Sequence, residues 1–430
     1  MPRLARLIPG KHFTGAVALA LTLSACGGSA SSLPSGTGSP PPASPASVAA
    51  SAAAKPASAA ASASAKPAAS ASASASASAA AKPSIAGQSG ALAGGSVGPA
   101  ASGQFTDGNP YLAKPGEAPV TVKAGWCAVS AGFTQLYVAR DYDLFGKYGI
   151  KIQTQGMNSG ANAALAALTK GEFDFMYCAA AGTIPGLAAG LPDKLLSAPL
   201  VGLPYVMVAN KNIHSVQELK GKKIGISKPG DLDDVLSHDV LKANNVDAST
   251  VTMQPAGGQT ERYTNILGGV IDAANVTPPL EVQAKKDGLN VIYQLKDLNI
   301  PFIYSAIHAS DDGLKSHPQT VQRFVAALAE STWWMSTHKQ QAEASITKQL
   351  GITDQAALDS AFEAYSNTYA NRSVDVPMQA VQDSIALAKT QGTPVKLEKA
   401  DQLVDLKYVQ DLQTSGFLEK MWGKKIPPSK

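Results

Sequence analysis

Five short segments between residues 120 and 178 decide the fold. VTVKAGW (120–126), IKIQTQ (150–155) and FDFMYC (173–178) are rich in β-branched and aromatic residues, which is typical of strands. TQLYVARDYDLFGKY (134–148) and ANAALAALT (161–169) separate them and predict helices. Strands that alternate with helices indicate parallel sheets covered by helices, so the sequence predicts the α/β class.

A second set of the same kind follows. Its predicted strands are 222–226, 251–254, 271–275 and 290–295, and its predicted helices are 231–243, 261–267 and 280–286. Two apolar extended segments, 205–209 and 302–308, flank this set and lie roughly a hundred residues apart, which is the size of a small domain. The chain therefore crosses twice between two lobes, and two crossings predict a hinge. From residue 319 onward the pattern is helical, and these helices are expected to pack back on the first lobe.

The first 26 residues resemble an export signal. Three basic residues, Arg3, Arg6 and Lys11, precede an apolar run at 13–23 that is too short to span a membrane permanently. The run ends in Leu23-Ser24-Ala25-Cys26, which resembles the bacterial lipobox. We therefore predict a lipoprotein signal peptide at 1–25 and lipidation of Cys26. An ordinary signal peptide is the alternative.

The next segment has a composition that cannot build a core. Residues 41–80 contain 37 Ala, Ser or Pro residues, and we expect 26–118 to be a disordered linker that starts at the lipid anchor. A flexible coil of this length reaches about 50 Å. From residue 119 onward there are 29 basic and 30 acidic side chains, so the folded part is nearly neutral. This balance argues against a nucleic-acid partner.

Four segments resemble a known family. They are residues 139–150, 168–175 and 216–225, together with His317-Pro318 ahead of a Val-rich helix. In this order, behind a lipobox, they are similar to substrate-binding proteins of ABC importers for nitrate, taurine, aliphatic sulfonates and thiamine-pyrimidine precursors. The resemblance covers about 119–418. It implies a two-lobed periplasmic-binding-protein type II fold, with lobe 1 at 119–207 plus 303–430 and lobe 2 at 208–302.

The resemblance also implies a function. We expect an extracytoplasmic, lipid-anchored solute-binding component that captures a small nitrogen- or sulfur-containing organic molecule between its lobes. Its expected partners are this ligand, an ABC permease with its ATPase, and the membrane through the anchor; a monomer is expected, with no cofactor and no metal. An enzyme similar to a thiamine-pyrimidine synthase and a ligand sensor without transport remain alternatives. A binder rather than an enzyme is favoured, because the six histidines show no ligand spacing and no HExxH motif.

Ligands of open α/β sheets bind beyond the carboxyl ends of the strands, and this rule selects the candidate site residues. Aromatic faces there can stack on a flat ligand, while hydroxyls and helix-start amides orient it. The alternative for each residue is a helix cap or a core position. The candidates are Trp126, Ser130, Phe133, Ser159, Gly160, Cys178 and Ala179 in lobe 1, and Ser227, Gly230, Asp231, Asn275 and Thr277 in lobe 2.

Charge and thiols refine this set. Asp231, Asp233 and Asp234 open one predicted helix with only Lys228 to offset them, which disfavours an anionic ligand and favours a neutral or nitrogen-rich one. The alternative is that these carboxylates cap the helix and face solvent. Cys127 and Cys178 follow neighbouring strands; a disulfide is possible, but we favour two partly buried free thiols.

Overall fold

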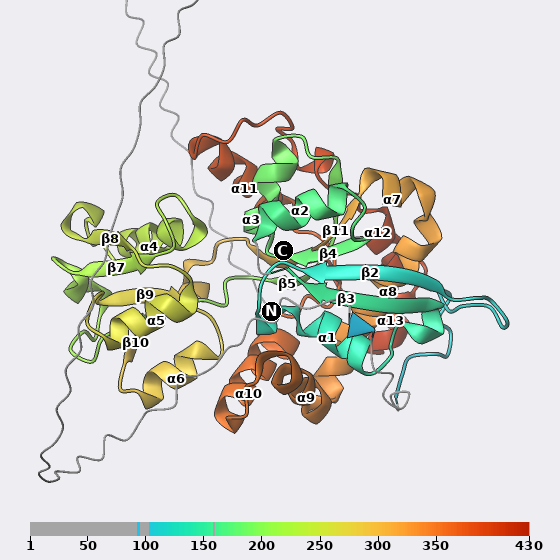
Figure 1. Cartoon of the computed structure of the whole chain (residues 1–430), viewed down its shortest axis with the longest axis horizontal. Helices are drawn as coiled ribbons and strands as arrows, with labels where there is room; N and C mark the ends of the chain where they lie inside the picture. Colours follow the sequence, from blue (N-terminus) through green and yellow to red (C-terminus); the bar gives the residue numbers. More distant parts are fainter. Residues whose placement is uncertain (1–92, 95–102, 158–159, 430) are drawn as a thin grey trace, which may run out of the picture. The chain divides into compact units, whose positions relative to one another are not determined.

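The computed structural model describes residues 93–94, 103–157 and 160–429, and it contains two mixed β-sheets covered by helices (Figure 1). The predicted leader at 1–25, with Cys26, lies outside the described residues. Among those that are described, no helix has the length and apolar character needed to cross a membrane.

The first sheet has six strands in the order β1-β3-β2-β4-β11-β5. Alternate residues of each strand face opposite sides, so Phe175 and Tyr177 enter one core with α1 and α8, while Met176 and Cys178 enter the other with α2 and α3. The strands are β1 (Ala93–Gly94), β2 (Val120–Trp126), β3 (Ile150–Gly156), β4 (Phe175–Cys178), β5 (Asp193–Val201) and β11 (Ile303–Ser310). The helices between them are α1 (Thr134–Asp141), α2 (Ala161–Thr169) and α3 (Ala180–Ala188).

The second sheet has five strands in the order β10-β6-β9-β7-β8. Its two faces are likewise apolar: Met207 and Ile224 pack under α4, while Val208 and Val276 pack under α5 and α6. The strands are β6 (Val206–Ala209), β7 (Lys223–Ile226), β8 (Thr252–Pro255), β9 (Ala273–Val276) and β10 (Asn290–Gln294). The helices are α4 (Leu232–Ala243), α5 (Gln259–Leu267) and α6 (Leu280–Lys286).

The two passages between the sheets differ from the prediction. Segments 205–209 and 302–308 were expected to join the lobes, but most of each is a strand, β6 in the second sheet and β11 in the first. The chain passes between the sheets just before each strand, at 202–205 and 295–302. Both strands run antiparallel to neighbours, β6 against β9 and β11 against β4, so the sheets are mixed rather than parallel. The division of the chain into lobes at 207/208 and 302/303 stays a prediction.

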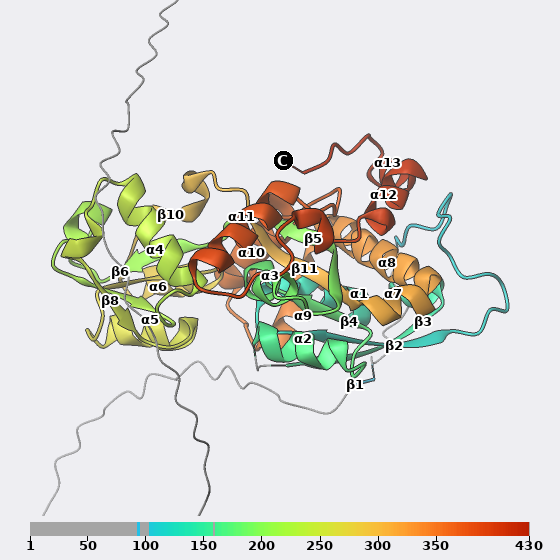
Figure 2. The same cartoon turned by 90° about the horizontal axis from the view of Figure 1, so that it is seen from above.

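The helical pattern predicted from residue 319 onward is confirmed, and one helix just before it, α7, was not predicted. Phe324 of α8 stacks on Phe175 of β4 with ring centroids 3.8 Å apart, and Figure 2 shows α8 lying along this sheet (Figure 2). These helices are α7 (Asp311–Ser316), α8 (Pro318–Thr337), α9 (Lys339–Leu350), α10 (Gln355–Phe362), α11 (Met378–Thr390), α12 (Lys407–Thr414) and α13 (Phe417–Trp422). A π-helical turn at Glu363–Thr368 follows α10.

The disordered linker was expected to extend through residue 118, whereas residues 103–118 are described and pack on the first lobe. Phe105 contacts Phe417 edge-on at 5.4 Å, and its backbone N–H donates to the fully buried carboxylate of Glu330 at 2.8 Å. Glu117 pairs with Arg323 at 2.6 Å. The folded body therefore begins well before residue 119.

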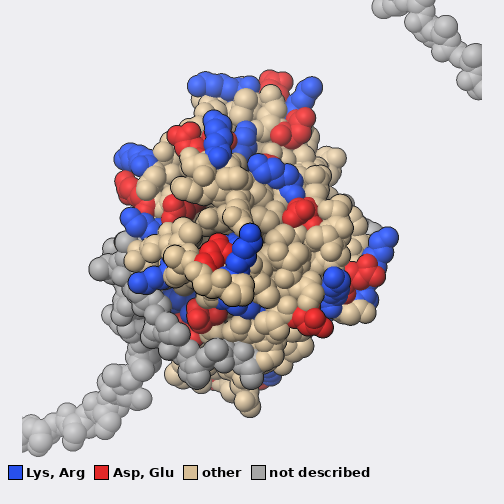
Figure 3. Space-filling view, turned by 90° about the vertical axis from the view of Figure 1, so that its right-hand side faces the viewer, with Lys and Arg blue, Asp and Glu red and all other residues tan. Residues whose placement is uncertain are grey.

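Surface charge follows the near-neutral composition. On the face drawn in Figure 3, Lys and Arg side chains are interspersed with Asp and Glu rather than gathered by sign (Figure 3). A mixed surface of this kind gives no large single-sign field on that face.

Candidate functional site

Five segments that are distant in sequence meet around the side chain of Tyr304, at the start of β11. The Ser130 hydroxyl, in the loop after β2, lies 3.4 Å from the Tyr304 hydroxyl. The Tyr304 ring centroid is 5.8 Å from that of Tyr365, in the π-helical turn, and 6.1 Å from that of Tyr205, in the first passage. The fifth segment follows β9 of the second sheet, where the Pro278 carbonyl accepts the Tyr365 hydroxyl at 3.1 Å. Loops of both lobes and one passage thus share one location, which we call the tyrosine site.

The tyrosine site is tightly packed on its first-lobe side. A Cβ on Gly132 would lie only 2.3 Å from Cε1 of Tyr304, so glycine lets this loop approach the ring. Tyr304 is 7 % exposed and Tyr365 is fully buried. Both rings are therefore almost entirely shielded from solvent in this structure.

The second lobe adds charge to the tyrosine site. Burial raises the pKa of Tyr205, and the Tyr304 hydroxyl and the Asp233 carboxylate raise it further, whereas the Arg262 guanidinium opposes them. Asp233 and Arg262 form a buried ion pair at 2.8 Å. Tyr205 is thus a neutral phenol whose electrostatic neighbours belong to both lobes.

Of the predicted lobe 1 site residues that the structure describes, only Ser130 is shown in direct contact with the tyrosine site. Trp126 is buried against Tyr137, at 5.1 Å between ring centroids, and Phe133 is buried against Tyr177, also at 5.1 Å. They are core residues beneath the loop, and their direct contact with a ligand stays a prediction. Gly160 and Ala179 cap the starts of α2 and α3 with no side-chain hydrogen bond, and Ser159 lies outside the described residues.

The thiol prediction was wrong, because Cys127 and Cys178 form a disulfide. The register pairs Trp126 with Tyr177, so Cys127, just after β2, and Cys178, the last residue of β4, lie side by side with Cα atoms 5.2 Å apart. This separation is within the usual range for a disulfide, although the strands are parallel. The bond joins the two strand ends that carry the loops at 127–133 and 178–180.

The predicted residues of lobe 2 lie around the start of α4 and the end of β9. Ser227 donates through its N–H and its hydroxyl to Asp233, both at 2.7 Å, and the same hydroxyl lies 2.7 Å from Asp231. Asn275 is fully buried and donates to the Ser237 hydroxyl at 3.0 Å. Thr277 donates to Gln259, and Gly230 donates its N–H to Asp234 at 2.8 Å.

The sequence did not identify the tyrosines as site residues. Tyr205 and Tyr304 stand at the starts of the two apolar segments that were noted as crossings, and this position is the signal that could have found them. Tyr365 carried no such signal, because it lies in a helical region whose contact with β9 depends on tertiary packing. Arg262 was hidden in a helix that was predicted to begin only one residue before it.

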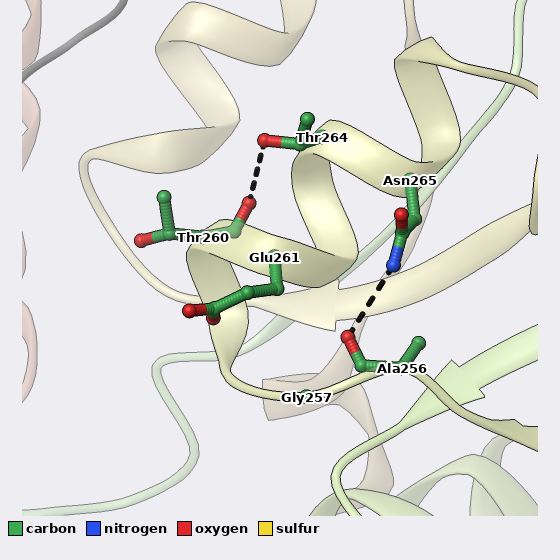
Figure 4. A pocket seen from close by; sticks show the side chains of 6 residues that line it. All are labelled: Ala256, Gly257, Thr260, Glu261, Thr264 and Asn265. Carbon is green, nitrogen blue, oxygen red and sulfur yellow. Dashed lines mark hydrogen bonds between the residues drawn. The ribbon is translucent and has the colours of Figure 1, made fainter. Parts of the chain in front are cut away.

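An open pocket of about 430 Å³ lies elsewhere on the second lobe, beside the start of α5 (Figure 4). In Figure 4 the Asn265 side chain reaches back to the Ala256 carbonyl, and Thr264 bonds the Thr260 carbonyl. The lining comes from residues 256–265 alone, so an occupant would contact one lobe only. We therefore place the candidate ligand site at the tyrosines and not in this pocket, since closure requires contact with both lobes.

Two further observations concern catalysis. Among the described residues, no group of three or more His, Cys, Asp or Glu side chains could hold a metal ion. His308 is fully buried between Thr183, at 2.9 Å, and the Met176 carbonyl, at 3.3 Å, and burial lowers its pKa to about 4. It is therefore a neutral core histidine at pH 7.

Two α/β sheets joined by two passages define the class of two-lobed periplasmic-binding-protein folds. Within this chain, residues 130–342 match the family model described as NMT1/THI5 like.

Three proteins that this chain resembles have names that describe binding proteins. A protein of Brucella abortus (strain 2308) with the provisional name of binding protein is 25 % identical over 252 residues, which cover 56 % of this chain and 74 % of that protein. A Bacillus subtilis (strain 168) protein, provisionally named an aliphatic sulfonates-binding protein, is 25 % identical over 209 residues, 46 % of this chain and 60 % of the relative. The fold resembles the alkanesulfonate-binding protein SsuA from Xanthomonas axonopodis pv. citri bound to MOPS, with a TM-score of 0.55, 16 % identity, and coverage of 67 % of this chain and 99 % of that one.

Proposed function

We propose that this protein is the extracytoplasmic solute-binding component of an ABC importer, which captures a small organic molecule between its two lobes. The two-lobed fold and the names of the relatives support this assignment. The observation that carries it is the tyrosine site, where Ser130, Tyr304 and Tyr365 of one lobe meet the Thr277–Pro278 segment of the other beside the passage residue Tyr205.

The mechanism follows from this geometry. A ligand seated between the tyrosines would contact both lobes, and only a ligand that interacts differently with the open and closed arrangements shifts their populations. Aromatic rings supply apolar contact with few rotatable bonds, and the Ser130 and tyrosine hydroxyls supply hydrogen bonds that orient the ligand. The closed form would then dock on the permease, which works with its ATPase.

The anchor and the oligomeric state belong to the same proposal. We expect Cys26 to carry the lipid, a monomeric body, and the segment between Cys26 and β1 to act as the tether. Cys26→Ser should abolish labelling by a radioactive fatty acid and release the protein from membranes. Continued labelling of this variant would refute the lipoprotein assignment.

Thermal-shift screening of the full chain against sulfonates, nitrate, pyrimidines and amines tests the binding function. A solute that binds only the folded state raises the melting temperature by mass action. Ser130→Ala should weaken that response, while Thr264→Ala, in the pocket of residues 256–265, should leave it unchanged. If no solute in any class raises the melting temperature, the binding function is rejected.

Two alternatives share this fold. For an enzyme similar to a thiamine-pyrimidine synthase, mass spectrometry would show the bound solute altered after incubation, whereas a binding protein returns it unchanged. For a sensor without transport, the solute binds but cells that lack the protein still import it. The importer assignment predicts loss of uptake in those cells.

A further inference from the structure

The start of α4 holds a buried carboxylate where a binding lobe could hold an anion. Asp233 is 7 % exposed, and its two oxygens accept a backbone N–H and a hydroxyl from Ser227, both at 2.7 Å. One of these oxygens also forms an ion pair with the Arg262 guanidinium at 2.8 Å. An amide, a hydroxyl and a guanidinium are the donors that a carboxylate, sulfonate or nitrate ligand would use. In this chain the carboxylate of Asp233, and not a ligand, contacts these groups.

Neighbouring donors are occupied in the same way. The N–H of Gly230 donates to Asp234 at 2.8 Å. Arg262, which is 3 % exposed, also donates to the carbonyls of Gly257 at 2.7 Å and Asn275 at 3.3 Å, so protein atoms hold its guanidinium in place. Within the described part of the chain, only its buried Nε lacks a hydrogen-bond partner. The positive end of the helix dipole is likewise offset by carboxylates in the first turn.

The remaining charge of this turn is negative. Its carboxylates are those of Asp231, Asp233 and Asp234. Lys228 lies 3.6 Å from Asp231, whose side chain is 38 % exposed, Arg262 pairs with Asp233, and the His238 ring lies 3.3 Å from Asp234. The Asp233 carbonyl accepts a hydrogen bond from Asn275 at 3.2 Å, and Asn275 lies two residues before Thr277, so this turn borders the tyrosine site. The Asp233 carboxylate also raises the pKa of Tyr205. An anion approaching from that site would meet repulsion and few open donors.

We infer that Asp233 is a specificity-determining residue: its carboxylate occupies the anion position of the second lobe and excludes anionic ligands, so that the solute presents a neutral or cationic nitrogen to Asp231 and the tyrosines. This inference rests on the proposed binding function. It differs from what the names of the sulfonate-binding relatives would suggest.

Removing the internal carboxylate tests the inference. Asp233→Ser frees the Ser227 N–H and the Arg262 guanidinium, and calorimetric titration of the full chain with methanesulfonate should show binding at least tenfold tighter than in the parent protein. Asp239→Ser is the matched control, because it removes one charge from the same helix and leaves Asp233 bonded to Ser227 and Arg262. This control should bind methanesulfonate no better than the parent.

Asp233→Ser leaves a buried guanidinium without its partner, which costs stability. Methanesulfonate should therefore also raise the melting temperature of this variant more than that of the control. If Asp233→Ser fails to fold even with methanesulfonate, the melting temperature of the parent protein is used instead. A rise with methylammonium and none with methanesulfonate supports the inference, and any other result overturns it.

Three outcomes separate the inference from the function. Tight binding of methanesulfonate by the parent overturns the inference and leaves the binding function intact. A folded Asp233→Ser variant that gains no response to methanesulfonate also overturns it. If Asp233→Ser gains binding of methanesulfonate but no solute stabilises the parent protein, the anion-position assignment is supported and the proposed function is refuted.

Discussion

Gly132 controls how closely the loop after β2 approaches the Tyr304 ring. Because an added Cβ would lie 2.3 Å from Cε1 of Tyr304, Gly132→Ala forces the ring or the loop to move. We expect a loss of about 1 to 3 kcal/mol in the free energy of unfolding, the usual cost of overpacking, together with weaker binding at the tyrosine site. Urea unfolding measures the first effect. Gly268→Ala is the control, since its nearest neighbour would lie 3.5 Å away; equal losses in both variants would contradict this account.

His308 gives the molecule a pH dependence with a defined sign. Its folded-state pKa is about 4, below the ordinary value of 6.5, so the unfolded chain binds a proton between these values and the folded chain does not. Stability from this residue is complete above pH 6.5 and falls as the pH is lowered toward 4, by about 3 kcal/mol in total. In His308→Gln, the part of the dependence of unfolding free energy on pH that comes from this residue should disappear. An unchanged slope in the variant would mean that His308 does not titrate in this way.

Single residues show where sequence reasoning succeeds and fails. The place of Ser130 beside Tyr304 agrees with its prediction as a residue that follows a strand end, while its contact with a ligand stays a prediction. The sequence shows that Asp231 and Asp233 make the start of this helix negative. It does not show that Arg262 neutralises Asp233, because that ion pair joins α4 to α5 across 29 positions. The pairing of Cys127 with Cys178 was misjudged because the register of β2 and β4 sets it, and register is not visible in one sequence.

The disulfide acts at the scale of elements, because it joins the ends of β2 and β4 across 51 positions. A crosslink of this span stabilises a fold by about 2 to 4 kcal/mol through the entropy of the unfolded chain. We therefore expect the double variant Cys127→Ser with Cys178→Ser to lose this amount. Chemical unfolding of the oxidised parent and the double variant measures it, and a reducing agent should destabilise only the parent. Equal sensitivity of both proteins to the reductant would contradict the pairing.

Residues 103–118 are a second element, and substituting single side chains measures how much it contributes to stability. Phe105 contacts Phe417 and Trp333, and burying a phenylalanine stabilises a fold by about 1.5 to 3 kcal/mol. Phe105→Ala should lose about 2 kcal/mol of unfolding free energy, because Phe105 is only half-buried. Tyr111→Phe is the control, since it removes a hydroxyl bonded to an exposed Asp411 and should cost less than 1 kcal/mol. If Phe105→Ala leaves the free energy of unfolding unchanged, the interpretation of this segment as a linker is supported instead.

Elements with a clear period were predictable, and those shaped by tertiary contacts were not. The strand at 120–126 and the helices at 161–169 and 280–286 have the predicted bounds. The predicted helix at 134–148 ends at Asp141, because Asp143 has a left-handed backbone with a φ of 50°. Helix α3 and strand β5 were not predicted: α3 contains Gly182 and Pro185, and β5 contains Pro199, so local preference is weak and packing against the sheet decides.

At the scale of the whole molecule, direct contacts join the lobes around the tyrosine site. Lys286 of α6 pairs with Asp354 at the start of α10, and Glu281 accepts a hydrogen bond from Ser360. On another segment, Gln391 donates to the Gly230 carbonyl. These contacts are mostly exposed and contribute little each, so a ligand between the lobes can supply the larger part of the closing free energy.

The central claim is that a solute binds between the lobes at the tyrosines. Calorimetric titration of one stabilising solute into the parent, Tyr205→Ala and Thr264→Ala proteins tests it most directly. We predict that Tyr205→Ala weakens binding at least tenfold, about 1.4 kcal/mol, through loss of ring contact, while Thr264→Ala binds like the parent. Unchanged affinity in a folded Tyr205→Ala protein, together with weakened binding in Thr264→Ala, would place the solute in the pocket of residues 256–265 and contradict the account.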